Sequence, residues 1–143
     1  MVARRILTME QVNDRLPLVE AIVRDIVSLH ADIASRRSRL EIFRSRRPAS
    51  SGMGSAYEEE VQQMKDELLR DERRLNDYTD ELAGIGGQIS DPAHGRVDFL
   101  SELGHDPVWL CWQLGEARVM YWHAGPCDES ERIPICHATE TSG

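Results

Sequence analysis

Residues 16–40 read LPLVEAIVRDIVSLHADIASRRSRL, and this segment carries the clearest structural signal in the chain. A mostly apolar set of residues recurs in it at alternating spacings of three and four, which places the set along one side of a helix. A stripe this narrow is typical of a helix that packs lengthwise against a second helix. The positions concerned are Leu16, Val19, Val23, Ile26, His30, Ile33, Arg37 and Leu40.

The two ends of this helix carry their own signals. Thr8 followed by Gln11 is a capping-box pattern, in which each side chain accepts a hydrogen bond from the other residue's backbone amide. Pro17 lacks the amide hydrogen that an inner helical position donates, so we expect a short helix to about Arg15 and then a kink or restart near Pro17. The predicted helical arm covers residues 8–46 and ends in a linker rich in Ser, Gly and Pro.

A second stripe with the same spacing predicts another helical arm over residues 56–84. Because a short polar loop joins the two arms, they should form a long antiparallel hairpin that resembles a coiled coil. In the predicted register the numbers of facing residues add up to 101, so that Leu40 faces Val61 and Ile33 faces Leu68. A slip by one heptad would require an asymmetric loop.

This register puts His30 and Asp71 in one layer of the hairpin. Such a pair either forms a polar core layer that fixes the register at some cost in stability, or acts as a buried acid–base pair. We favour the polar core layer, because a tight interface between two helices leaves no room for a substrate.

The last third of the chain is rich in aromatic and β-branched residues, which favour strands. We expect a small antiparallel sheet over residues 95–123, including a hairpin of residues 108–114 and 117–123 around Gly115 and Glu116. An irregular tail over residues 124–143 follows. The expected fold class for residues 1–143 is a single α+β domain. In the predicted hairpin one face holds Leu110, Trp112, Val119 and Tyr121, and the other holds Trp109, Cys111, Met120 and Trp122.

Composition excludes several classes of protein. The chain has 143 residues, a net charge of −8 and a pI near 5.1, which argues against a general nucleic-acid binder. It contains neither an apolar run long enough to span a bilayer nor a signal-peptide pattern, so we expect no membrane association. Its three cysteines cannot all pair within one chain, which favours a cytoplasmic protein with free thiols.

Several blocks of the sequence resemble a bacterial family catalogued as domain of unknown function 2203. They are LTMEQVN at residues 7–13, LPLV at 16–19, GRVDF at 95–99, LCWQLGE at 110–116, the dipeptide Trp122-His123 and RIP at 132–134. The resemblance covers nearly the whole chain and implies helices followed by a small β region. It implies no activity, because the family is uncharacterised.

Two groups of residues are candidates for chemistry. The polar residues within or beside the family-like blocks include carboxylates and one histidine, which can act as acid and base or hold a divalent metal. These candidate catalytic residues are Asp98, Glu116, His123 and Arg132. A second set has the ligand types of a tetrahedral zinc site, although its spacing is not that of a zinc finger and its residues also suit incidental roles. This set is His123, Cys127, Cys136 and His137.

No motif indicates an enzyme, and we expect no cofactor apart from zinc or another divalent metal at these residues. The leading hypothesis is a non-enzymatic scaffold or interaction module that self-associates as a homodimer, with an unidentified protein partner as a further option. One reason is the set of apolar residues beside the stripes: Val12, Ile22, Val27, Leu29, Ile42 and Leu69. The alternatives are a small metal-binding or acid/base enzyme around Asp98, Glu116 and His123, and a binder of nucleic acid or an acidic partner through the arginines between Arg36 and Arg47.

Overall fold

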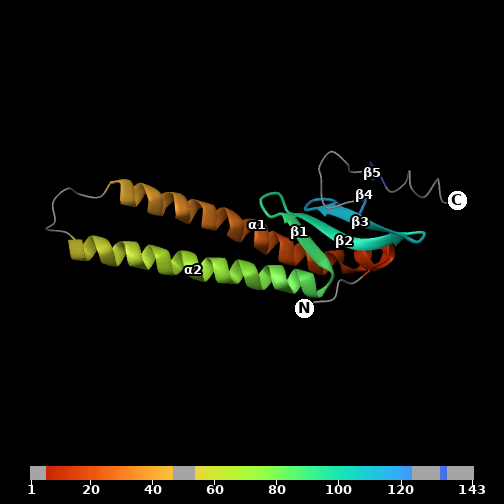
Figure 1. Ribbon diagram of the computed structural model, residues 1–143, viewed down its shortest axis with the longest axis horizontal. Helices are drawn as coiled ribbons and strands as arrows, with labels where there is room; N and C mark the ends of the chain where they lie inside the picture. The colour runs from red at the N-terminus through yellow and green to blue at the C-terminus, as the bar shows by residue number, and fades with distance from the viewer. Residues whose placement is uncertain (1–5, 47–53, 124–132, 135–143) are drawn as a thin grey trace.

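The computed structural model describes residues 6–46, 54–123 and 133–134 of the chain. Two long helices, α1 (Met9–Ser45) and α2 (Gly54–Gly84), lie side by side as an antiparallel hairpin and extend away from a small sheet (Figure 1). The α+β class and the helical hairpin are therefore confirmed. The strands are β1 (Gly87–Asp91), β2 (Arg96–Leu103), β3 (Asp106–Gln113), β4 (Tyr121–His123) and β5 (Ile133–Pro134).

Helix α1 begins at the predicted cap. The backbone N–H of Thr8 donates to Gln11 Oε1 at 2.9 Å, and the N–H of Gln11 donates to Thr8 Oγ1 at 3.1 Å. Of the two predicted possibilities at Pro17, a kink or a restart, the restart does not occur, since a single helix runs through this residue to Ser45. The buried side chains of Leu16 and Val19 flank the proline, and their packing compensates for the hydrogen bond that Pro17 cannot donate.

Two contacts at opposite ends of the hairpin report its register. The rings of Phe43 and Tyr57 stack with their centroids 5.0 Å apart. Near the sheet, Arg15 Nη1 donates to the carbonyl oxygen of Ile85 at 2.8 Å. In both pairs the residue numbers add up to 100, close to the sum of 101 in the predicted register. The long side chains of Arg36 and Arg37 reach partners for which the sums are 103 to 109.

The described strands form one antiparallel sheet in the order β1-β2-β3-β4-β5. It starts at Gly87, eight residues before the predicted start, so β1 lies outside the predicted sheet. This strand is short and contains a glycine that close packing requires. A Cβ on Gly87 would lie 2.9 Å from Leu82 Cδ1 and 3.0 Å from Val97 Cγ1.

The pairing predicted for the last hairpin is wrong by one residue. Strand β3 pairs with β4 through Leu110 opposite Trp122, whereas the predicted turn would set Leu110 opposite Tyr121. Residues 114–120 form a longer connection that other parts of the chain hold: the Val119 N–H donates to Asn13 Oδ1 of α1 at 2.9 Å. A slip of one residue reverses the face of every later side chain, so Trp122 joins the helix-facing side and Tyr121 leaves it.

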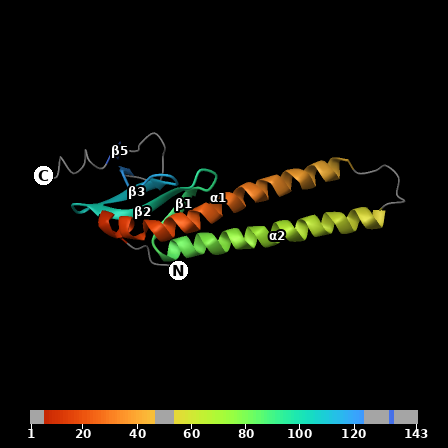
Figure 2. The same cartoon turned by 180° about the vertical axis from the view of Figure 1, so that it is seen from behind.

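The core lies between the N-terminal half of α1 and one face of the sheet, at the end opposite the hairpin tip (Figure 2). Three of the apolar residues that suggested a dimer, Val12, Ile22 and Leu29, are buried within the chain. Val27 packs against the core as a partly buried residue. Of that set, only Ile42 and Leu69 are exposed, which removes part of the sequence-based argument for self-association.

Candidate functional site

Three side chains that can bind metal or protons meet on the sheet face that points away from α1. Asp98 of β2 lies opposite Cys111 of β3, and His123 of β4 pairs with Trp109, two residues before Cys111. Because side chains alternate along a strand, all three lie on the face opposite the core residue Leu110. The possible ligand atoms of Asp98, Cys111 and His123 all lie within 4.8 Å of one another.

The cluster is almost completely shielded from solvent. Asp98 is 4% exposed, and Cys111 and His123 are 0% exposed. His123 Nε2 lies 3.2 Å from Asp98 Oδ1, within hydrogen-bonding distance. Burying a carboxylate is costly unless a hydrogen bond or a positive charge compensates it. This arrangement can therefore hold a His–Asp pair or surround a cation.

The structure brings together part of the predicted site. Asp98 and His123 are adjacent, as the metal or acid/base hypothesis requires. Glu116 is elsewhere: it sits in the connection after β3, where its Oε1 accepts from the Gln113 N–H at 2.7 Å. Cys111 was missed because the predicted register placed His123 on the opposite face. The predicted residues that lie outside the described part of the chain are Cys127, Arg132, Cys136 and His137.

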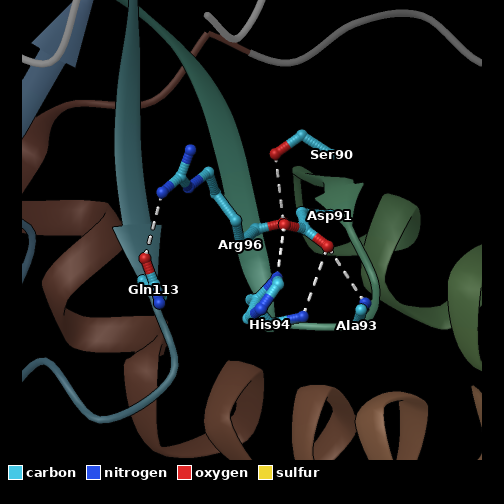
Figure 3. Close-up of polar contacts among 6 residues, drawn as sticks. All are labelled: Ser90, Asp91, Ala93, His94, Arg96 and Gln113. Atoms are coloured by element: carbon cyan, nitrogen blue, oxygen red, sulfur yellow. Dashed lines mark hydrogen bonds and ion pairs between the residues drawn. The ribbon is translucent and has the colours of Figure 1, made fainter. Parts of the chain in front are cut away.

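Polar contacts continue along this face toward β1 (Figure 3). Arg96, two residues before Asp98 on the same face, is 8% exposed, and its Nη2 donates to Gln113 Oε1 at 3.2 Å. At the nearby turn, Asp91 Oδ2 lies 2.8 Å from His94 Nδ1, and its Oδ1 accepts from the His94 N–H at 3.3 Å. The side-chain hydrogen bond from His94 lowers the pKa of Asp91 below its usual value of 3.8.

A cavity of about 340 Å³ lies near the start of α1 and the β2–β3 turn. Its walls are mostly apolar and include Leu7, Leu103, Leu110 and Trp122. Asp98, Cys111 and His123 do not line it, because Leu110 and Trp122 point to the other face of the sheet. The cavity therefore gives a substrate no access to the buried cluster.

The polar residues of the hairpin pair differently from the predicted layer. Arg36 Nε lies 2.8 Å from Asp71 Oδ2, and Arg36 Nη1 lies 2.8 Å from Glu67 Oε2. Among the residues that the structure describes, no ion pair joins His30 to Asp71, and Asp71 pairs with Arg36. His30 is half-buried. Arg36, six residues further along α1, forms the ion pair with Asp71 in its place.

The cations toward the hairpin tip are partly neutralised. Besides the pairs of Arg36, Arg37 Nη2 lies 3.5 Å from Glu72 Oε2. Further along, a hollow of about 510 Å³ is lined by both signs of charge, with Arg44 and Lys65 beside Glu58. This mixture favours mutual neutralisation over a surface for nucleic acid, which needs positive charge gathered on one face.

Neither described helix is long and apolar enough to cross a membrane. No curated protein matches the chain, and no solved structure does. A family model described as "Uncharacterized conserved protein (DUF2203)" matches residues 5–135. Because this match spans far more than half of the sequence, the chain belongs to the DUF2203 family.

Proposed function

We propose that the chain is a non-enzymatic interaction protein of the cytoplasm that self-associates as a homodimer through its helical arm, defined as residues 29–46 and 54–78. The observation that carries this proposal is the low burial of the side chains of α2. Leu82, near the sheet, is the one buried residue in this 31-residue helix, all of which the structure describes. The arm is therefore held by the contact of two helices and little else.

The apolar stripe of α2 is incompletely covered along the whole arm. Its residues are half-buried: Tyr57, Val61, Met64, Leu68, Leu75 and Tyr78. Two apolar side chains beside it, Ile42 and Leu69, are 48% and 49% exposed. Helices gain most of their stability from packing an amphipathic face, and four-helix bundles bury such stripes more fully than a lone pair. The helical arm of a second copy, packed against the first, would bury these side chains.

Two copies of the chain, related by a twofold axis and packed arm against arm, are the simplest assembly, since closed dimers are the commonest symmetric oligomers. A helix from another protein laid along the same stripe is the second candidate, supported by the same half-buried residues. An enzyme is less well supported, because the Asp98–Cys111–His123 cluster is buried and apart from the apolar cavity. Catalysis requires a pocket that admits substrate to such groups.

Co-purification of two differently tagged copies tests the homodimer. We expect capture of one tag to recover the other copy, and a double charge substitution, Ile42→Glu with Leu69→Glu, to abolish this recovery. The control is Leu103→Glu, because Leu103 is also exposed but belongs to the sheet. Circular dichroism would establish that all variants keep their helices.

Two outcomes would contradict the homodimer. One is failure of the unmodified copies to recover each other, and the other is equal recovery by the arm variant and the Leu103→Glu control. Failure of the copies to associate, combined with capture of one defined partner that the arm variant loses, would favour the second candidate.

A further inference from the structure

Asp98, Cys111 and His123 converge from three neighbouring strands, although they are widely separated in the sequence. The register of β2, β3 and β4 carries the three side chains to one face. Each is at least nine-tenths buried, and an oxygen, a sulfur and a nitrogen atom come within 4.8 Å of one another. Three ligand-type side chains gathered in a shielded space of a small sheet call for a chemical reason.

The donor set has the composition of a zinc site. Zinc is bound in proteins by cysteine sulfur, histidine nitrogen and carboxylate oxygen, usually in tetrahedral geometry. Magnesium and calcium prefer sites made only of oxygen ligands, so the cysteine and histidine argue against them. A reduced thiol is required, and Cys111 is free of disulfides.

The spacing of the nitrogen and oxygen donors agrees with a shared ion. With zinc bonds to nitrogen and oxygen of about 2.0–2.1 Å, two ligands of a tetrahedral ion lie about 3.3 Å apart. His123 Nε2 and Asp98 Oδ1 are 3.2 Å apart. This distance is also at the long end of the range for a hydrogen bond, and longer than is usual when a charge assists the bond.

We propose that Asp98, Cys111 and His123 are three protein ligands of one zinc ion, with Cys111 as its single sulfur ligand. The ion would join β2, β3 and β4 on the face that α1 does not cover, and would balance the negative charges of the carboxylate and the thiolate. This inference goes beyond the proposed function and is independent of it, because the hairpin arm takes no part in the site.

The first test measures the metal and its ligands in the unmodified protein. The chain is purified under reducing conditions, supplied with zinc, desalted and assayed for metal content, and its zinc is examined by X-ray absorption. We expect one zinc per chain and a coordination shell with a single sulfur at about 2.3 Å among nitrogen and oxygen ligands. Substoichiometric zinc, or a shell with two or more sulfurs, would overturn the proposal.

The second test identifies the sulfur. A Cys127→Ser, Cys136→Ser variant keeps Cys111 as its one thiol, since the sequence has three cysteines. Loaded with cobalt(II), it should show the same thiolate-to-metal charge-transfer band as the unmodified chain. Loss of that band from the folded variant would assign the metal to the set predicted from the sequence and would overturn the site at Cys111.

Substitutions at the ligands complete the test. Cys111→Ser, His123→Gln and Asp98→Asn should each lower zinc affinity at least tenfold, whereas His105→Ala, an exposed histidine in the β2–β3 turn, should leave it unchanged. Equal affinity in all four folded variants would contradict the proposal. If the ligand variants do not fold, the sulfur count of the unmodified protein still decides.

Discussion

Two histidine–carboxylate contacts in this molecule show how surroundings set the role of a residue pair. His94 and Asp91 lie at an exposed turn, where their contact of 2.8 Å closes a local loop. His123 and Asp98 are buried, 3.2 Å apart and beside a thiol. The first pair stabilises a turn in water, whereas the second occupies a shielded space where each polar group must be compensated.

The pH dependence of stability should include a contribution from Asp91. Because its folded pKa is lowered, its ionised form stabilises the fold above the unfolded value of 3.8, and this stabilisation is lost as pH falls through the folded pKa. We expect an NMR titration to place the Asp91 carboxyl below 3.8. Asp91→Asn keeps the oxygen that accepts from the Ala93 and His94 amides and should lack this pH-dependent part. Titration at or above 3.8 would contradict the assignment.

Gly95 should tolerate substitution poorly, because its backbone has a φ of +71° and the turn touches α1. A Cβ there would lie 2.8 Å from Leu114 Cβ and 3.0 Å from Val23 Cγ1. Gly104 is the matched control, with a φ of +67° and no atom within 4 Å of its Cβ position. In urea unfolding, Gly104→Ala should cost about 1–2 kcal/mol, and Gly95→Ala about 1–3 kcal/mol more. Equal costs would show that the contact with α1 is unimportant.

At the scale of elements, local signals predicted the helices well and the strands less well. The cap at Thr8 and the two stripes depend on neighbours in sequence, so they could be identified without the fold. The continuity of α1 through Pro17 depends on burial of Leu16 and Val19 by distant residues. The connection that leads into β4 includes a contact of Val119 with Asn13, which joins residues far apart in the chain.

The ion pair between Arg36 and Asp71 should contribute measurably to the hairpin. Asp71 is the less exposed partner, at 14% of its side chain, and the two atoms are 2.8 Å apart. A double-mutant cycle with Arg36→Ala and Asp71→Ala should give a coupling free energy of about 0.5–1 kcal/mol, which salt reduces. The cycle of Arg24 with Glu20, an exposed pair on one helix, should give less. A coupling near zero for Arg36 and Asp71 would contradict their role in joining α1 to α2.

At the scale of the whole molecule, the sequence predicted the hairpin and sheet but not the site that the sheet assembles. Asp98 and His123 were candidates because of their chemistry, and the structure places them together. Cys111 could not be added to them, because a register error of one residue turns His123 toward the helices. Such pairings depend on long-range contacts, which hydrophobic periodicity does not report.

The molecule combines a compact base with a hairpin whose outer part packs only against itself. In the core cluster α2 contributes one buried residue, Leu82, while α1 contributes six of them between Val12 and Ile26. The half-buried stripe beyond this base is the feature that the proposed homodimer explains. Pairing of two arms would bury it without changing the sheet or its polar cluster.

The absolute mass of the untagged chain in solution distinguishes the proposed homodimer from a monomer. Light scattering coupled to size-exclusion chromatography measures mass independently of shape, which matters for an elongated molecule. We predict twice the 16.3 kDa of one chain at micromolar concentration, and a fall toward the single-chain mass in the Ile42→Glu, Leu69→Glu variant. A mass of 16.3 kDa for the unmodified protein, unchanged on concentration, would rule out the homodimer.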